Sequence, residues 1–92
     1  MDQIQRQIAR LLGYPLSATL TDGALTAGLM AQPERAAAGL VDEAFASDDV
    51  GCAHAARSFV EERVAEWQEI ISDDVRHRIA SIASIEIQRR AP

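Results

Sequence analysis

Carboxylates are the chemically active side chains with the most regular spacing in this 92-residue sequence. Four of them recur at intervals of four, three and four residues, which places them on one helix face: Glu62, Glu66, Glu69 and Asp73. Such a row can be a docking surface for a basic partner, a cluster of metal ligands, or a solvated face. Repulsion at this spacing costs a helix about 0.2–0.5 kcal/mol per pair, and Arg63 could relieve part of it at Glu66. We interpret the row first as a solvated face, and we retain these four residues as the candidate partner-binding surface.

His77 and Cys52 are the other side chains that could take part in chemistry. Asp73 and Asp74 precede His77 by four and three residues, so either carboxylate could approach the imidazole on one helix face. Cys52 and His54 lie two residues apart, and on a helix they point to different faces, which excludes a catalytic dyad. We expect His77 to be an exposed or capping residue and Cys52 to be buried or half-buried. We expect no catalytic residue, no metal ligand and no cofactor.

Positive charge is confined to arginine, since all nine basic residues are arginines. The absence of lysine excludes Schiff-base chemistry and a phosphate-binding loop with its lysine. Residues 47–74 hold eight acidic residues and two arginines, whereas residues 75–92 hold four arginines and one acidic residue. The net charge of −5 disfavours nonspecific binding to nucleic acid, and Arg89 and Arg90 suit the C-terminal end of a helix. We therefore expect no direct contact with nucleic acid.

Trp67, the only tryptophan, lies on an apolar line that predicts one long helix over about residues 50–71. The same line contains Ala53, Ala56, Val60, Val64 and Ile71, with Phe59 and Ile70 beside it. We expect this helix to be the central one and Trp67 to anchor the core. If the bundle leaves the line exposed, Trp67 would instead be an interface hot spot, so it joins the carboxylate row as a candidate partner-binding residue.

Helical spacing of apolar residues elsewhere predicts an all-α fold, a compact antiparallel bundle of four to five helices. The other helices are expected over about residues 2–12, 22–31, 33–46 and 75–90, with the strand-like alternation of residues 84–88 as a weaker alternative. Gly23, Ala27 and Ala31 are expected to form a smooth face against a neighbouring helix. The other residues expected to face inward are Ile4, Ile8, Leu11, Leu12, Leu25, Leu29, Met30, Ala37, Leu40, Val41, Ala44, Phe45, Ile79, Ile82, Ala83 and Ile85.

Length and composition predict one helical domain over residues 1–92, with 48% hydrophobic residues. A core of this size is marginal by itself, so self-association would stabilise it. No apolar run approaches the roughly 20 residues that span a bilayer, and the first residues lack the apolar stretch of a secretory signal. The joint absence of lysine and asparagine indicates a GC-rich genome. These features predict a cytoplasmic protein of a bacterium or phage, with no membrane contact.

Because the sequence offers no catalytic, metal, cofactor or nucleic-acid site, our leading hypothesis is a non-enzymatic protein that binds another protein with a basic surface. A small acidic chain of this origin fits an inhibitor or regulator of a larger, nucleic-acid-handling complex, including one of anti-CRISPR type. Its carboxylates would occupy a basic groove where phosphates otherwise bind. The alternative is a structural or accessory subunit that forms a homodimer or a larger helical homo-oligomer. An enzyme or metalloprotein would rest only on His77 with Asp73 or Asp74.

Overall fold

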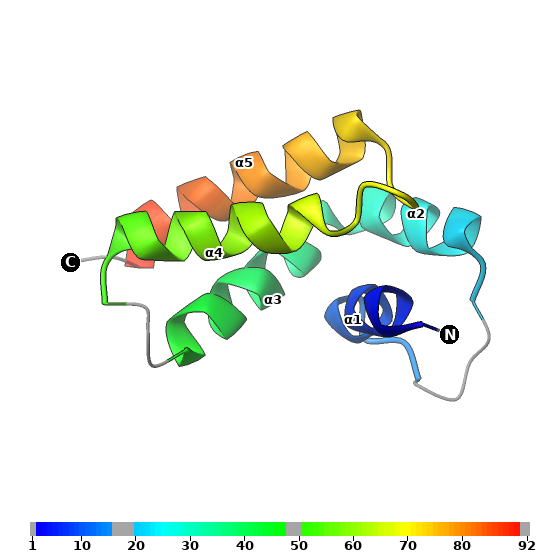
Figure 1. The fold of residues 1–92 in the computed structure, drawn as a ribbon, viewed down its shortest axis with the longest axis horizontal. Helices are drawn as coiled ribbons and strands as arrows, with labels where there is room; N and C mark the ends of the chain where they lie inside the picture. Colours follow the sequence, from blue (N-terminus) through cyan, green and yellow to red (C-terminus); the bar gives the residue numbers. More distant parts are fainter. Residues whose placement is uncertain (1, 16–19, 48–50, 91–92) are drawn as a thin grey trace.

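The computed structural model describes residues 2–15, 20–47 and 51–90, and Figure 1 shows their arrangement. Within these ranges the chain forms helices and no strand, so residues 84–88 are helical and the predicted all-α fold is confirmed. The five helices are α1 (Gln3–Leu11), α2 (Asp22–Ala31), α3 (Pro33–Ala46), α4 (Ala53–Ala65) and α5 (Asp73–Arg90).

Polar side chains fix the beginnings of the first two helices. The carboxylate of Asp2 accepts a hydrogen bond from the backbone N–H of Gln5 at 2.9 Å, and Gln5 Oε1 accepts one from Asp2 N–H at 3.0 Å. This reciprocal capping box satisfies two N–H groups that a helix start leaves unpaired. Thr21 caps α2 through the backbone N–H of Ala24 at 3.1 Å. Gln5 also donates to the Asp22 carboxylate at 2.8 Å and so joins α1 to α2.

The long central helix expected over residues 50–71 is not present. The helix α4 ends at Ala65, and residues 66–70 continue as tight turns, while Val50 lies outside the described residues. The central element is instead α5, the longest of the five helices, which packs against α2, α3 and α4. Figure 1 shows α4 and α5 side by side and antiparallel, with α3 packed across them and α1 and α2 toward one end.

The apolar line of residues 53–71 stays on the core side in spite of this break. Hydrogen bonds from Trp67 N–H to the Val64 carbonyl at 3.0 Å and from Ile71 N–H to the Trp67 carbonyl at 2.9 Å keep the turns close to helical geometry. Trp67 is therefore fully buried, together with Val60, Val64 and Ile71. The prediction that Trp67 anchors the core is confirmed.

Three apolar residues expected to face inward are exposed instead: Met30 (60%), Phe45 (38%) and Ile85 (59%). The predicted small-residue face of α2 is also wrong, because Gly23, Ala27 and Ala31 are all exposed. Gly28 takes this role and is buried where α2 meets the end of α1. The helix α2 is thus rotated relative to the prediction.

One ion pair joins the end of α5 to the C-terminal half of α3. The guanidinium of Arg90 binds the carboxylate of Asp42 and also that of Glu86, with Nε 2.8 Å from Glu86 Oε1. The hydrogen bond to Asp42, followed by that to Glu86, raises the pKa of Arg90 above its ordinary value. Arg90 is therefore charged at every pH at which the protein is studied.

Replacing Asp42 by asparagine is expected to lower the free energy of unfolding by less than about 1 kcal/mol, because solvent screens this half-exposed pair. The measurement is urea unfolding of both chains at low salt and in about 1 M salt, where the Debye length falls to about 3 Å. The difference should shrink at high salt. A loss that is larger and unaffected by salt would show that Asp42 contributes through packing rather than charge.

Candidate functional site

The predicted carboxylate row does not lie along one helix, because α4 ends before the row is complete. Glu62 is on α4, Glu66 is its C-cap, Glu69 lies in the following turns, and Asp73 begins α5. All four side chains are exposed. Glu66 and Glu69 line the same groove, whereas Asp73 lines a different one.

Glu66 and Glu69 line a groove between the α4–α5 connection and α1, with a volume of about 470 Å³. We call this the acidic groove; its lining residues are Gln3, Ile4, Gln7, Glu66, Gln68 and Glu69. Within the described residues, neither Glu66 nor Glu69 forms an ion pair or a side-chain hydrogen bond. Both carboxylates are thus free to accept hydrogen bonds from an arginine or lysine of another molecule.

A second groove of about 450 Å³ lies on the other side of Gln3 and Gln7 and carries the opposite charge. We call it the basic groove; it is lined by Gln3, Arg6, Gln7, Arg10, Glu43 and Arg63. The side-chain oxygen of Gln7, which belongs to both grooves, is buried and has no hydrogen-bond partner among the described residues. The outer face of α1 therefore separates a negative groove from a positive one.

The guanidinium of Arg63 lies near Glu43 and Phe59 and forms no ion pair with the carboxylate row. Its Nη1 lies 4.0 Å from Glu43 Oε2, and its guanidinium lies 5.1 Å from the centre of the Phe59 ring. A cation over an aromatic face is attracted by the negative potential of the ring. The expectation that Arg63 relieves Glu66 is therefore wrong, because α3 offers it a carboxylate that the sequence does not place nearby.

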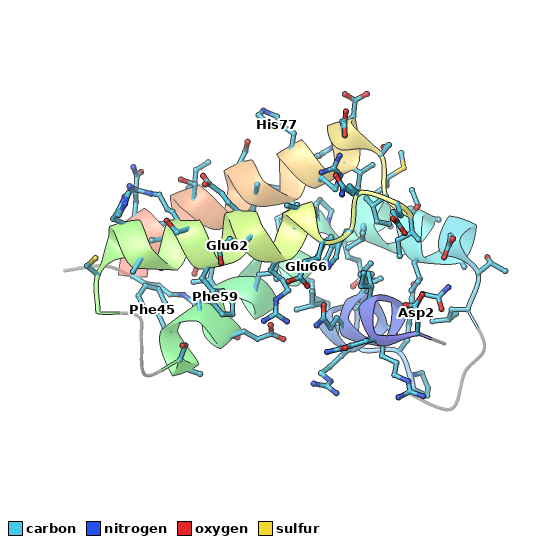
Figure 2. All side chains as sticks on the ribbon, in the orientation of Figure 1. Asp2, Phe45, Phe59, Glu62, Glu66 and His77 are labelled. Atoms are coloured by element: carbon cyan, nitrogen blue, oxygen red, sulfur yellow. The ribbon has the colours of Figure 1, made fainter. Side chains whose placement is uncertain are left out.

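Asp73 and His77 belong to a third groove, of about 300 Å³, between α4 and α5. Asp73 binds Arg76, whose Nε also donates to the Ile71 carbonyl at 3.1 Å. Figure 2 shows His77 on the side of α5 away from Glu62 and Glu66, in agreement with its expected exposure. Across residues 2–15, 20–47 and 51–90, no three His, Cys, Asp or Glu side chains are placed to hold a metal ion.

The burial of Trp67 and the exposure of Cys52 decide two further expectations from the sequence. Trp67 is fully buried, so its side chain offers no surface to a partner, and the hot-spot alternative for it does not hold. Cys52 is exposed at the N-cap of α4, which makes the predicted buried or half-buried thiol wrong. The reason is that α4 begins at Ala53, so Cys52 precedes the helix rather than packing within it.

The basic C-terminal region is largely neutralised by neighbouring groups. Arg76 pairs with Asp73, and Arg89 and Arg90 both pair with Glu86. Arg78, the fourth arginine after residue 74, is exposed and forms no ion pair within the described residues. Arg6 and Arg10 of α1 likewise form no ion pair within the described residues.

The polar residues of α1 are the part of the site that the sequence did not indicate as functional. They occupy the polar side of an amphipathic helix, which in an isolated sequence is indistinguishable from a solvated face. Only their position beside Glu66 and Glu69 distinguishes them. In the part of the chain that the structure describes, no helix is long and apolar enough to cross a membrane. Comparison with known proteins finds no matching family model, no matching curated protein and no matching solved structure.

Proposed function

We propose that this chain is a non-enzymatic protein that acts by binding another protein through the acidic groove. The observation that carries the proposal is the pair of exposed carboxylates of Glu66 and Glu69, which have no ion-pair partner among the described residues and lie in a groove whose other polar side chains are amides. Carboxylates with no internal cation are the groups that gain most from a basic partner. Glu62, exposed on α4 and labelled beside Glu66 in Figure 2, extends the negative surface.

The adjacent basic groove restricts the distribution of charge that a partner's surface can have. A surface that is positive throughout would meet repulsion from Arg6 and Arg10 as it approached Glu66 and Glu69, because the two grooves share a wall. The preferred partner therefore presents a basic segment for the acidic groove and an acidic or polar segment for the basic groove. Juxtaposed opposite charges of this kind select one orientation and suppress others.

In this proposal the protein works in the cytoplasm of a bacterium, or of a phage-infected bacterium, as an inhibitor or regulator of a larger complex. The negative overall charge of −5 supports a target that itself binds nucleic acid, since such a target carries a basic surface. Glu66 and Glu69 would occupy positions that phosphates otherwise take. This would include complexes of the type that anti-CRISPR proteins inhibit.

The test is a nuclease-treated pull-down from a GC-rich bacterial lysate with the wild-type chain and two double variants. In Glu66→Arg/Glu69→Arg, repulsion replaces attraction at the groove, so affinity for a stoichiometric partner should fall at least about 100-fold. In Glu61→Arg/Asp74→Arg, the same change in net charge falls on exposed residues outside the acidic groove, so the partner should be retained. Thermal unfolding of both variants verifies that the fold is intact.

Equal loss with the two variants would show that only overall charge matters and would contradict a docking site at the groove. Unchanged capture by Glu66→Arg/Glu69→Arg would contradict the proposal directly. A partner lost after nuclease treatment would indicate a bridge of nucleic acid and would also oppose it. Testing Glu62→Arg separately shows whether the α4 carboxylate belongs to the contact.

A further inference from the structure

A fourth groove, between α3 and α5, combines exposed apolar atoms with two carboxylates and one guanidinium. It is small, about 130 Å³, and is lined by Glu34, Ala38, Ile82, Ile85, Glu86 and Arg89. Ile85 is 59% exposed and Ile82 is half-buried, on a flank of α5 different from the one that Ala80 and Ser84 present to α4. The flank with Ile82 and Ile85 has no covering element among the described residues.

The register of the two helices places Glu34 and Arg89 at opposite ends of this groove. The helices α3 and α5 run in the same general direction in Figure 1, and Arg90 pairs with Asp42 across them. Counting back eight residues on each helix puts Glu34 level with Ile82, at one end of the groove. Arg89 lies one turn beyond Ile85, at the other end. Ile85 therefore lies between a carboxylate on one side and a guanidinium on the other.

We propose that a second copy of this chain docks on this groove, around a two-fold axis that passes beside Ile85. A two-fold axis brings the same patch of both copies together, so each end of one groove meets the opposite end of the other. Ile85 of one copy packs against Ile85 of the partner copy, and Glu34 of each copy pairs with Arg89 of the other. The two ends of the groove, Glu34 and Arg89, are thus complementary to each other in charge, which is the property that a symmetric dimer requires. The remaining carboxylate, Glu86, stays paired with Arg89 and Arg90 of its own copy.

The side chains of Glu34 and Arg89 are both available to form an ion pair with a second copy. Glu34 is exposed and forms no ion pair within residues 2–15, 20–47 and 51–90. Among the described residues Arg89 is held only by Glu86, at 3.4 Å, and its side chain is 76% exposed. A guanidinium has five N–H donors, so Arg89 can bind a carboxylate of the partner copy while it keeps Glu86.

The size of the chain limits the area that the dimer can bury. The monomer exposes 5493 Å². One tenth of that surface is about 550 Å² per copy, which is below the roughly 800 Å² of standard stable interfaces. We therefore expect a reversible dimer that dissociates in the micromolar range. This groove shares no residue with the acidic groove, so dimerisation and partner binding can fail independently.

Sedimentation equilibrium of the full chain from about 10 µM to about 1 mM measures this dimer. In Ile85→Arg, two like charges meet on the axis, so the dimer should be lost across this range. The matched control is Met30→Arg, which adds the same charge at an apolar residue of equal exposure outside the groove. That variant should dimerise like the wild-type chain.

A charge exchange tests the orientation of the two copies. Glu34→Arg alone and Arg89→Glu alone should each weaken the dimer at least about tenfold, because like charges then meet at both ends. An equimolar mixture of these two variants should form heterodimers, in which both pairs again have opposite charges. The double variant Glu34→Arg/Arg89→Glu should likewise recover self-association.

Several results would overturn the proposal. These are a wild-type chain that remains monomeric at about 1 mM, an Ile85→Arg chain that still dimerises, or single variants that do not recover on mixing. A monomeric wild-type chain whose capture of another protein is abolished by Ile85→Arg would show a different occupant of the groove. Loss of partner capture in Glu66→Arg/Glu69→Arg with an intact dimer would leave this inference standing.

Discussion

Replacing Trp67 by alanine is expected to lower the free energy of unfolding by about 3–5 kcal/mol. The indole is fully buried in the core cluster that also contains Val60, Val64 and Ile71, and its removal would leave a large cavity. A 92-residue domain has a total stability of roughly 5–14 kcal/mol, so this single change removes a large part of it. The position of Trp67 in the turns that follow α4 adds to the effect, because no regular helix holds this segment.

Urea unfolding and thermal unfolding, followed by circular dichroism, measure this loss, and Trp67→Phe is the matched control. The indole N–H has no hydrogen-bond partner among the described residues, so phenylalanine removes volume without breaking a hydrogen bond. Its cost should be clearly smaller than that of alanine. If Trp67→Ala kept its melting temperature but changed the oligomeric state, the tryptophan would belong to an interface rather than to the core.

Replacing Gly28 by valine is expected to lower the free energy of unfolding by about 1–3 kcal/mol. A Cβ atom at Gly28 would lie 2.7 Å from Leu12 Cδ1 and 2.7 Å from the hydroxyl oxygen of Tyr14. Both distances are well below van der Waals contact, and Leu12 is only 2% exposed, so it has little room to move. The larger valine side chain would therefore force α2 away from the end of α1.

The same helix provides a control of opposite sign. Gly23 is exposed, and a Cβ there would meet only Thr21 Oγ1, at 3.9 Å. Gly23→Ala should therefore stabilise the protein by about 0.5 kcal/mol, because alanine restricts the unfolded chain and favours a helix. Urea unfolding of the two variants should show shifts in opposite directions. A stabilising Gly28→Val would mean that α2 does not pack closely on α1.

The acidic and basic grooves explain why a motif search on this sequence finds no functional site. Glu66 and Glu69 are separated by about 60 residues from Gln3 and Gln7, and no regular spacing relates the two pairs. Arg6 and Arg10 are equally distant from Arg63, with which they line the basic groove. When a surface is assembled from distant segments, the sequence of each segment shows only an amphipathic pattern. All surface helices share this pattern, so it does not indicate function.

The sequence by itself determined which segments are helical and most of what they bury. Apolar residues spaced for a 3.6-residue period identified Ile8, Leu11, Leu25 and Leu40 as core residues. It also identified the apolar line that ends at Ile71. These predictions succeeded because the burial of one helix face depends on residues close together in the chain.

Only the tertiary structure decided where α4 ends, which way α2 is rotated, and which charges lie together. No glycine or proline occurs between Glu62 and Ile71, so nothing in the local sequence marks the end of α4 at Ala65. Met30, Phe45 and Ile85 lie at the margins of their apolar stripes, and the crossing of neighbouring helices left each of them exposed. Helix rotation and crossing depend on contacts between distant residues. The end of α4, the rotation of α2 and the two charged grooves therefore depend on how the helices pack against one another.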